Sequence, residues 1–259
     1  MQRLSAPAKL TVTLRITGVR DDGYHLLDAE MASVDLADTL ELDAGDGLEL
    51  VDEVAGGLGM QGVDSGAGNL VARALQLVGR RAAVRLVKRI PVGAGLGGGS
   101  ADAAAVLRWA GCDDPRVGAQ LGADVPFCMV GGRARVRGAG EDVTPLPFEE
   151  RRFLALLPPL AVDTAAAYRA WDGGARLGGE GASGNDLEEA AIAVVPALAE
   201  WRQAFAEATG ARPRLAGSGA AWFVEDGDGA LAQRLGDALQ VGGVSGSLVP
   251  LRTVPAEGR

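Results

Sequence analysis

The sequence is poor in the residues that build disulfide frameworks and metal centres. It has two cysteines, Cys112 and Cys128, and a single histidine, His25. Two cysteines give no disulfide framework and no metal-binding spacing, and a lone histidine excludes a centre built on several imidazoles. The sequence also lacks an 18-residue apolar run and an apolar leader segment near its start. We therefore expect a cytoplasmic protein.

Basic residues are scarce as well. Lysine and arginine total 25 against 34 aspartates and glutamates, so the net charge is −9. Nucleic acids and anionic membranes require clustered cations, and the basic clusters here are short, so neither partner is expected. Only 4 % of the chain is aromatic, but 47 % is apolar. This is enough to form the core of one large domain or of two unequal ones.

Proline residues indicate where the chain divides. Four of them fall between residues 145 and 159, and we place a boundary near 150, with domains over 1–150 and 151–259. Before the boundary, alternating apolar residues predict strands and a 3.6-residue apolar stripe predicts a helix. After it, the pattern predicts the order β-α-α-β-β-α-β, which makes the fold class α+β.

Local patterns predict the individual elements. Strands are expected over 10–16, 26–36, 39–42, 83–90, 128–137, 141–146, 153–157, 221–225 and 247–254. Helices are expected over 69–78, 101–110, 116–121, 164–171, 185–209 and 229–239. We expect a break near Asp38, an N-cap at Ser100, and a kink or a new helix at Pro196.

Glycine, unlike cysteine and histidine, is abundant, and it is concentrated in the segment GAGLGGGS at 93–100. This segment lies between an expected strand and an expected helix. Glycines let backbone N–H groups turn toward an anion, and a helix N-terminus adds partial positive charge, so the segment predicts a phosphate loop. It opens no βαβ unit, as a dinucleotide loop would, and no lysine precedes Ser100, as in a Walker A loop. The H-R-D and D-F-G motifs of a protein kinase are also missing from the sequence.

The longer segment PVGAGLGGGSADAAA (91–105) resembles the phosphate loop of the GHMP kinases. Further matching segments occur in the family's order: APAKL (6–10), DGYH (22–25), DLADTL (35–40), GNL (68–70), GADVPF (122–127), GNDLE (184–188) and GSGAAWF (217–223). Together they resemble one branch, the 4-diphosphocytidyl-2-C-methyl-D-erythritol kinases of non-mevalonate isoprenoid synthesis. The resemblance implies a two-domain GHMP kinase fold. Its N-terminal ATP-binding domain would have a ribosomal protein S5 domain 2-like sheet, and its C-terminal domain would be ferredoxin-like.

The resemblance also implies the reaction, which is transfer of a phosphoryl group from ATP, with Mg²⁺, to the 2-hydroxyl of a cytidine diphosphate alcohol. In this reading Asp124 is the catalytic base. Lys9 lies beside Asp124, keeps it ionised and attracts the phosphate. Taken alone, the residues also allow a turn or N-cap aspartate and an exposed strand-edge lysine.

The resemblance assigns ATP binding to the glycine loop and two nearby segments. The residues are Pro91, Val92, Gly93, Ala94, Gly95, Leu96, Gly97, Gly98, Gly99, Ser100 and Ala101, with Asn69, Leu70 and Lys88 at the adenosine. Ser100 would contact phosphate or magnesium, act as a helix cap, or do both. Asn69 is an equally good cap. The resemblance implies no set of metal ligands.

The resemblance places the cytosine at Tyr24 and His25, with Tyr168 as a second aromatic face and Thr164 as a nearby contact. Thr11 stands where the family usually has asparagine, which weakens or rearranges one substrate contact. Ala101, a short segment before GADVPF and the glycine-rich stretch 172–184 also depart from the family pattern. Two alternatives stay open: a GHMP kinase for a sugar, homoserine or mevalonate-type alcohol, and a GHMP-fold protein that only binds. Monomer and homodimer are both compatible with the sequence.

Overall fold

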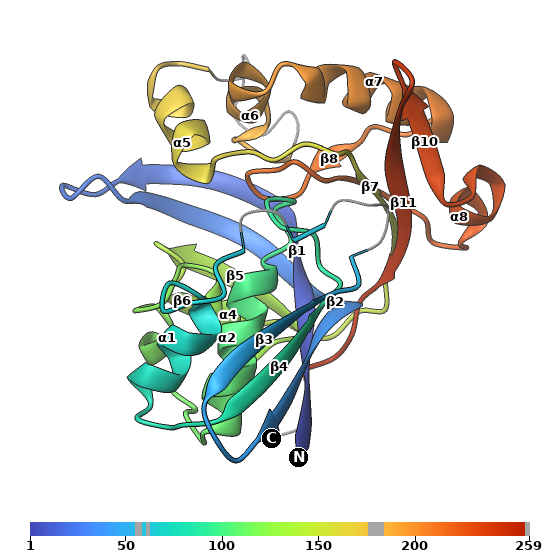
Figure 1. Ribbon diagram of the computed structural model, residues 1–259. Coiled ribbons are helices and arrows are strands. Elements are labelled where there is room, and N and C mark those ends of the chain that lie inside the picture. The colour runs from blue at the N-terminus through green and yellow to red at the C-terminus, as the bar shows by residue number, and fades with distance from the viewer. Residues whose placement is uncertain (55–58, 61–62, 176–183, 257–259) are drawn as a thin grey trace.

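The structure is a computed structural model that describes residues 1–54, 59–60, 63–175 and 184–256. Two β-sheets, each with its own helices, make up the molecule. In Figure 1 the sheet from the N-terminal part of the chain forms the lower half, and the sheet from the C-terminal part forms the upper half. A long hairpin of the first two strands projects between the two halves (Figure 1).

The first sheet has the strand order β3-β4-β2-β5-β6, and β1 pairs with β2 outside this path. Only β3 and β4 are parallel; the other pairs are antiparallel. The strands are β1 (Gln2–Val19), β2 (His25–Asp43), β3 (Gly47–Asp52), β4 (Ala83–Lys88), β5 (Arg133–Gly138) and β6 (Asp142–Pro145).

Four helices belong to this half of the molecule. They are α1 (Leu70–Leu77), α2 (Gly98–Trp109), α3 (Pro115–Gly118) and α4 (Val125–Val130). Helix α2 is central: its alanines 101 and 103–105 are buried against α1, α4 and β1. Alanine favours the helix and adds little bulk, so α2 can lie close to its neighbours.

The second sheet is antiparallel throughout, in the order β10-β11-β7-β9-β8. Its strands are β7 (Arg152–Leu157), β8 (Arg214–Leu215), β9 (Trp222–Glu225), β10 (Ala238–Val241) and β11 (Val244–Arg252). Its helices are α5 (Thr164–Asp172), α6 (Glu188–Val194), α7 (Ala197–Thr209) and α8 (Ala230–Leu235).

Strand β7 faces two different cores. Leu154 and Leu156 pack in the C-terminal core with residues of α7, whereas Phe153 and Leu157 face the other way. Successive side chains of a strand point to opposite faces, so an unbroken apolar run can fill two cores at once. The second of these cores also contains Leu10 of β1 and is shared by the two halves of the molecule.

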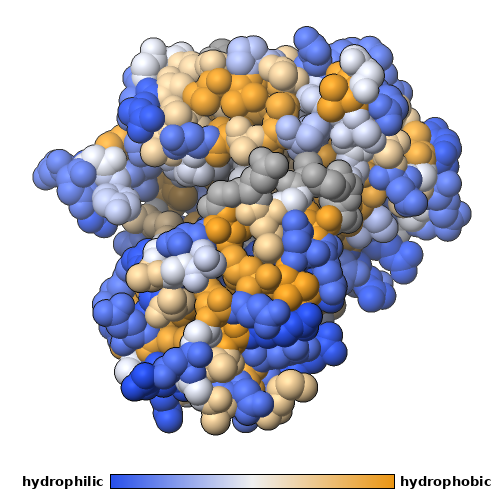
Figure 2. Space-filling view, viewed as in Figure 1, coloured by the Kyte–Doolittle hydropathy of each residue, from blue (hydrophilic) through white to orange (hydrophobic). Residues whose placement is uncertain are grey.

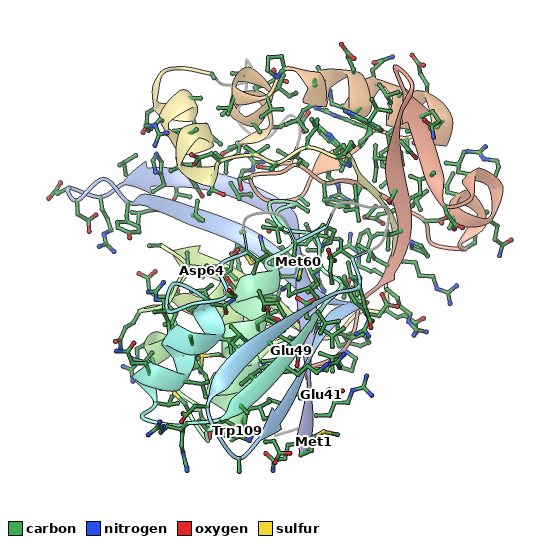
Figure 3. The ribbon with its side chains drawn as sticks, viewed as in Figure 1. Met1, Glu41, Glu49, Met60, Asp64 and Trp109 are labelled. Carbon is green, nitrogen blue, oxygen red and sulfur yellow. The ribbon has the colours of Figure 1, made fainter. Side chains whose placement is uncertain are left out.

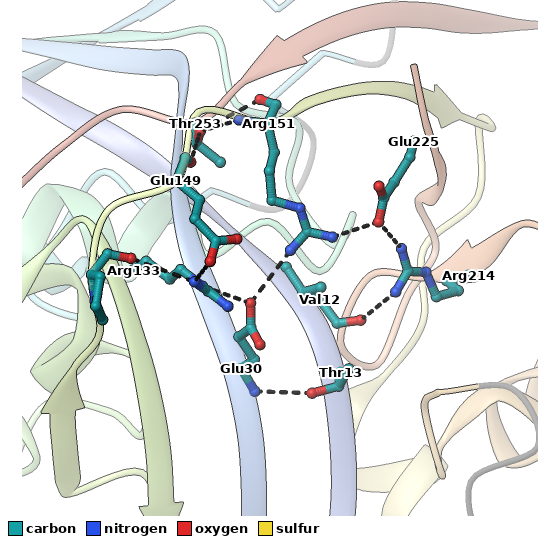
Figure 4. A network of polar contacts seen from close by, with 10 residues as sticks. Val12, Thr13, Glu30, Arg133, Glu149, Arg151, Arg214, Glu225 and Thr253 are labelled. Atoms are coloured by element: carbon teal, nitrogen blue, oxygen red, sulfur yellow. Dashed lines mark hydrogen bonds and ion pairs between the residues drawn. The ribbon is translucent and has the colours of Figure 1, made fainter. Parts of the chain in front are cut away.

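Polar contacts join the two halves beside this shared core (Figure 4). Arg151, just before β7, donates to Glu30 of β2 at 3.4 Å and to Glu225 of β9 at 2.5 Å. Arg133 of β5 donates to Glu30 at 2.9 Å, and Arg214 donates to Glu225 at 3.0 Å. Exposed ion pairs are individually weak. Here a linked set spans both sheets, so it helps to fix their relative position.

The α+β class predicted from the sequence is confirmed, and most predicted elements are present with shifted ends. Strand β6 ends at Pro145 and β7 begins at Arg152, on either side of the proposed boundary at 150, which stays a prediction. Among the described residues, no helix is long and apolar enough to cross a membrane.

Several local predictions are wrong. The N-cap of α2 is Gly97, not Ser100, which lies inside the first turn. There is no strand break near Asp38, because β2 continues through a bulge opposite Pro7 and Lys9. Residues 125–130 form helix α4, where the strand was expected to begin at 128. The expected helix 229–239 ends at Leu235, and a strand follows it.

Residues 185–209 form two helices. Pro196 is the N-cap of the second, α7, so the new helix that was one of the two outcomes expected at this proline is confirmed. Asn185 does not cap a helix from the N-cap position, which Leu187 occupies. Its side chain accepts a hydrogen bond from the Leu187 amide and donates to the Leu215 and Gly217 carbonyls. Most of the glycine-rich stretch 172–184 lies outside the described residues.

Candidate active site

A cavity of about 570 Å³ lies where the two halves of the molecule meet. Its lining includes Lys9 of β1, Asp124 and the whole segment from Pro91 to Ser100 from the N-terminal half. Tyr168 of α5 and the turn Gly217–Gly219 line it from the C-terminal half. In Figure 2 the surface is hollowed below the projecting β1–β2 hairpin, between the upper and lower halves.

The predicted catalytic pair comes together in this cavity. The Lys9 ammonium lies 3.3 Å from the Asp124 carboxylate and donates to the Thr11 hydroxyl at 3.1 Å. The Lys9 side chain is only 5 % exposed, whereas that of Asp124 is 32 % exposed. The lysine places a positive charge beside the carboxylate, and the remaining exposure of Asp124 leaves that carboxylate open to a substrate.

The purely structural roles that the sequence allowed for this pair fit the geometry poorly. Asp124 does occupy the N-cap position of α4, but its side chain makes no capping hydrogen bond. Lys9 is buried, so it is not an exposed strand-edge lysine. Tyr168 lines the same cavity, and burial, then the negative charge of Asp124, raises the pKa of its hydroxyl. Tyr168 therefore stays protonated beside the carboxylate.

The glycine loop is held against both halves of the molecule. Its Leu96 carbonyl accepts from the Lys9 amide at 3.0 Å. The Gly93 and Ala94 carbonyls accept from the Ala220 and Ala221 amides at 3.0 and 3.1 Å. Leu96 and Ala94 are also buried in the shared core. The loop is therefore anchored by its carbonyls and apolar side chains.

At two positions of the loop a residue larger than glycine would collide with neighbouring protein atoms. Gly97 has φ +68°, and a Cβ there would lie 2.7 Å from Lys9 Cγ. Gly95 has φ +77°, and a Cβ there would lie 2.0 Å from the Ala216 carbonyl oxygen. No side chain caps the N-terminus of α2 at Gly97. The first amides of a helix have no intrahelical acceptor, so those of α2 are available to an anion such as a phosphate.

A buried charge cluster lies beneath the loop. The Lys88 ammonium is paired with Asp38 and, at 2.7 Å, with Asp102. Burial is the largest influence on Lys88, but the two carboxylates outweigh it and its pKa is raised. Burial raises the pKa of Asp102 to about 7. The loop approaches this cluster closely, because a Cβ on Gly98 would lie 3.2 Å from the Lys88 ammonium.

Of the other residues predicted to bind ATP, Asn69, Leu70 and Lys88 line the cavity, whereas Ala101 is buried in the N-terminal core and does not. Asn69 is the N-cap of α1: its Oδ1 accepts from the Val71 amide at 2.8 Å, and its Nδ2 donates to the Asp64 carbonyl at 2.7 Å. The capping role of Asn69 is therefore confirmed. Leu70 follows at the cavity wall, and its Cδ1 would lie 3.4 Å from a Cβ on Gly99. The adenosine contacts of Asn69, Leu70 and Lys88 stay predictions.

The residues predicted to hold the cytosine lie at the hairpin and α5. His25 stacks on Tyr168, with ring centroids 4.5 Å apart, and its Nε2 lies 2.8 Å from Asp172 Oδ1. Tyr24 is 62 % exposed at the hairpin turn, and the Arg20 guanidinium lies 5.5 Å from the centre of its ring. His25, not Tyr24, is therefore the ring that contacts Tyr168 in this structure.

The structure also reveals site residues that the sequence reasoning did not single out. One of them is Ser218, whose Oγ lies 2.8 Å from Oγ1 of the predicted contact Thr164 and so brings the turn 217–219 to α5. Asp172 holds His25 from 147 positions away in the chain, a contact that no local pattern indicates. Asp102 could have been noticed, because it is a carboxylate inside a run of alanines and such a residue needs a partner when buried.

Within the described residues, no group of three or more His, Cys, Asp or Glu side chains is placed to hold a metal ion. The oxygen donors in the N-terminal turn of α2 and at Asp124 fit a different arrangement, in which a magnesium ion binds together with a nucleotide. Magnesium commonly keeps substrate phosphates and water as ligands and takes only one or two from the protein.

Comparisons with known proteins agree with this geometry. Residues 69–132, from the N-cap of α1 to the end of α4, match the family described as GHMP kinases N terminal domain. The chain is 40 % identical to the 4-diphosphocytidyl-2-C-methyl-D-erythritol kinase of Paracoccus denitrificans, with 86 % of each chain covered. It is 35 % identical to the enzyme of the same name from Moorella thermoacetica, over 93 % of this chain and 96 % of the other.

Solved structures point the same way. A crystal structure of 4-(cytidine 5'-diphospho)-2C-methyl-D-erythritol kinase superimposes with a TM-score of 0.70 at 31 % identity, covering 99 % of this chain and 100 % of the other. A mevalonate kinase shares the fold alone, with a TM-score of 0.57 at 13 % identity and 98 % and 99 % of the two chains covered. The chain therefore belongs to the GHMP kinase superfamily and, within it, to the 4-diphosphocytidyl-2-C-methyl-D-erythritol kinases.

Proposed function

We propose that this protein transfers the γ-phosphoryl group of ATP to the 2-hydroxyl of 4-diphosphocytidyl-2-C-methyl-D-erythritol. The observation that carries the proposal is the Lys9–Asp124 pair, 3.3 Å apart in the cavity that the glycine loop borders. Phosphoryl transfer needs little covalent chemistry from the protein. It needs positioning, a proton acceptor and cations that stabilise charge.

Asp124 is the proton acceptor in this proposal. Its carboxylate is partly exposed to the cavity and makes no capping hydrogen bond, so its oxygens remain available to a substrate hydroxyl. Lys9, beside Asp124, presents positive charge to the transferring group. Thr11 accepts a hydrogen bond from Lys9 and so holds the ammonium in place. This gives Thr11 a positioning role in addition to any substrate contact.

The glycine loop and α2 would hold the triphosphate. The uncapped N-terminus of α2 supports this role, and Gly95 and Gly97 let the loop pack closely against Ala216 and Lys9. Magnesium, when bound with the nucleotide, neutralises charge on the phosphates. Ser100, in the first turn of α2 and at the cavity wall, is the residue that we assign to the phosphate or its metal.

The cytidine end of the substrate would bind at the hairpin and α5. His25 and Tyr168 already stack, and Tyr24 is exposed on the hairpin where it can cover a base. Thr164, at the start of α5, contacts Ser218 of the turn 217–219. The family relationship favours this substrate over a sugar, homoserine or mevalonate, and over a protein that only binds a ligand.

The test is a coupled assay of ADP release with the cytidine diphosphate substrate. Asp124→Asn should reduce turnover by at least about 10²-fold, as expected for loss of a general base, while ATP still binds. Asp114→Asn is the matched control, because Asp114 is also an N-cap aspartate and lies outside the cavity. Near-normal turnover of Asp124→Asn would exclude Asp124 as the base. Faster turnover of homoserine or mevalonate than of the cytidine substrate would overturn the substrate assignment.

A further inference from the structure

A second cavity, of about 500 Å³, lies in the N-terminal half of the molecule. It shares no lining residue with the catalytic cavity. Its walls are the first residues of β1, the last turns of α2 and the C-terminal end of α4. In Figure 3 its residue Trp109 lies well below Asp64, which lines the catalytic cavity. The proposed kinase reaction gives this cavity no role.

Two of its walls lead directly to the catalytic pair. Strand β1 contributes Pro7 to the second cavity and, two residues later, Lys9 to the catalytic one. Helix α4 contributes Met129 to the second cavity, and its N-cap is Asp124. A shift of either element at the second cavity would therefore change the 3.3 Å contact between the lysine and the carboxylate.

The third wall leads to the phosphate loop. Helix α2 has 12 residues and is therefore about 18 Å long. Its N-terminus carries the loop, and Arg108 and Trp109 near its other end line the second cavity. Arg108 also ties the three walls together, because it donates to the Cys128 carbonyl of α4 at 2.5 Å and to the Ser5 carbonyl of β1 at 3.5 Å.

The lining combines positive charge with apolar surface. Arg3 and Arg108 contribute two guanidinium groups and Asp113 one carboxylate, in a protein whose net charge is −9. Within the described part of the chain Arg3 makes no ion pair or hydrogen bond through its side chain. The indole of Trp109 donates to the Gln2 side chain, which fixes the ring, and Met129 adds apolar surface. Guanidinium groups beside an aromatic ring suit an anionic group attached to an apolar body.

We propose that the second cavity is an effector site for a small organic anion that joins one phosphate or carboxylate group to an apolar body. Occupancy acts on catalysis through β1, α2 and α4, the three elements that carry Lys9, the phosphate loop and Asp124. The effect on turnover rests on the proposed kinase function, whereas binding to the cavity does not. The two are therefore measured separately.

Binding can be read from the chain's own cysteines. Cys112 is half-buried and lines the second cavity. Cys128 lines it too, but burial, followed by the charge of Asp124, raises the pKa of its thiol to about 12, so it has almost no reactive thiolate. Alkylation by iodoacetamide, followed by peptide mass spectrometry, therefore reports on Cys112. Phenyl phosphate serves as the probe, and benzoate tests a carboxylate in place of the phosphate. Phenol and inorganic phosphate, the two parts of phenyl phosphate, are tested separately as controls.

We expect saturating phenyl phosphate to slow Cys112 alkylation at least fivefold, also with the catalytic cavity filled by ATP. Phenol and inorganic phosphate alone should slow it less than twofold. Arg3→Ala should raise the phenyl phosphate concentration that gives half of the protection at least tenfold, whereas Arg73→Ala, at an exposed arginine of α1, should not change it. Protection by benzoate but not phenyl phosphate would identify a carboxylate ligand. Unchanged alkylation with both probes, or protection that ATP abolishes, would overturn the site.

Turnover tests the second half of the proposal. At the same phenyl phosphate concentration, kcat/KM should change at least threefold in the wild type and in Arg73→Ala, and should stay unchanged in Arg3→Ala. If Cys112 is protected but kcat/KM stays constant, the cavity binds the probe without acting on catalysis, and the effector role is wrong. If the wild type has no kinase activity at all, the proposed function fails, while the protection experiment still decides binding.

Discussion

Gly97 lies where the glycine loop meets Lys9, the lysine of the proposed catalytic pair, and Gly97→Ala tests whether this contact matters for turnover. The residue has φ +68° and is the N-cap of α2. An added Cβ would lie 2.7 Å from Cγ and 3.1 Å from Cε of Lys9, whose ammonium is 3.3 Å from Asp124. A Cβ–carbon contact as short as 2.7 Å cannot persist, so either the loop or the lysine has to move.

Two separate effects follow from this substitution. The left-handed conformation costs an alanine about 1–2 kcal/mol of stability. Displacement of Lys9 from Asp124 acts on catalysis, where a shift of about 1 Å can reduce the rate about 10²-fold. We therefore expect a folded variant with kcat/KM lowered about 10²-fold and with weaker ATP binding. ADP release measures the first quantity, and isothermal titration calorimetry with ATP measures the second.

Two other glycines separate these effects. Gly111 has φ +79° with open space around its would-be Cβ, so Gly111→Ala carries the conformational cost alone. Gly227 lies outside the cavity and has no positive φ and no atom within 4 Å of its would-be Cβ, so Gly227→Ala adds a methyl group without either effect. Both variants should keep near-normal turnover. If Gly97→Ala is as active as Gly111→Ala, the close approach of loop and lysine has no catalytic importance.

The remaining predictions concern the base pocket, a buried carboxylate and the shared core. Stacking on an aromatic ring is worth roughly 1–3 kcal/mol per base, so Tyr24→Ala should raise KM for the cytidine substrate by about one to two decades and leave KM for ATP unchanged; an effect confined to ATP would contradict this. The pKa of the Asp102 carboxyl is about 7 in the folded chain, against an ordinary value of 3.8. Between pH 3.8 and pH 7 the folded chain therefore keeps a proton on this carboxyl that the unfolded chain has lost. Stability should therefore fall as pH rises through this window, and Asp102→Asn should flatten the dependence measured by urea unfolding; an equal slope in both proteins would refute the assignment. Phe153→Ala should cost about 3–5 kcal/mol of unfolding free energy, against little change for the exposed Phe148→Ala, and equal costs would contradict the shared core.

Local sequence was sufficient for elements whose pattern is repeated over many residues. The alternation of β1, the apolar stripe of α1 and the unbroken apolar run of β7 are all recovered in the structure. A phosphate-binding role for the glycine loop is a prediction from the sequence, because so much glycine immediately before a helix exceeds what a turn requires and suits the close approach of an anion. The Lys9–Asp124 pair was inferred only through family resemblance, since a separation of more than a hundred residues gives no local signal.

Local sequence failed where a tertiary contact overrides a residue's own preference. Ser100 is a good cap by propensity, yet α2 begins earlier in the chain, because Gly97 must adopt a positive φ to pass Lys9. Residues 125–130 carry strand-forming residues but fold as α4, with buried side chains packed against α2. Propensity differences of under about 1 kcal/mol per residue are smaller than the stabilisation gained by burying such side chains.

The sequence by itself therefore determined which groups are available and predicted their use: a glycine loop for phosphates, a lysine, an aspartate and an aromatic pair. Only the tertiary structure decided which of those groups contact one another. It assigned Lys88 to two buried carboxylates, His25 to Asp172 and Tyr168, and Lys9 to Asp124. The physical reason is that the interactions of charged and polar groups depend on distance and burial. Both are set by the packing of residues that are far apart in the chain.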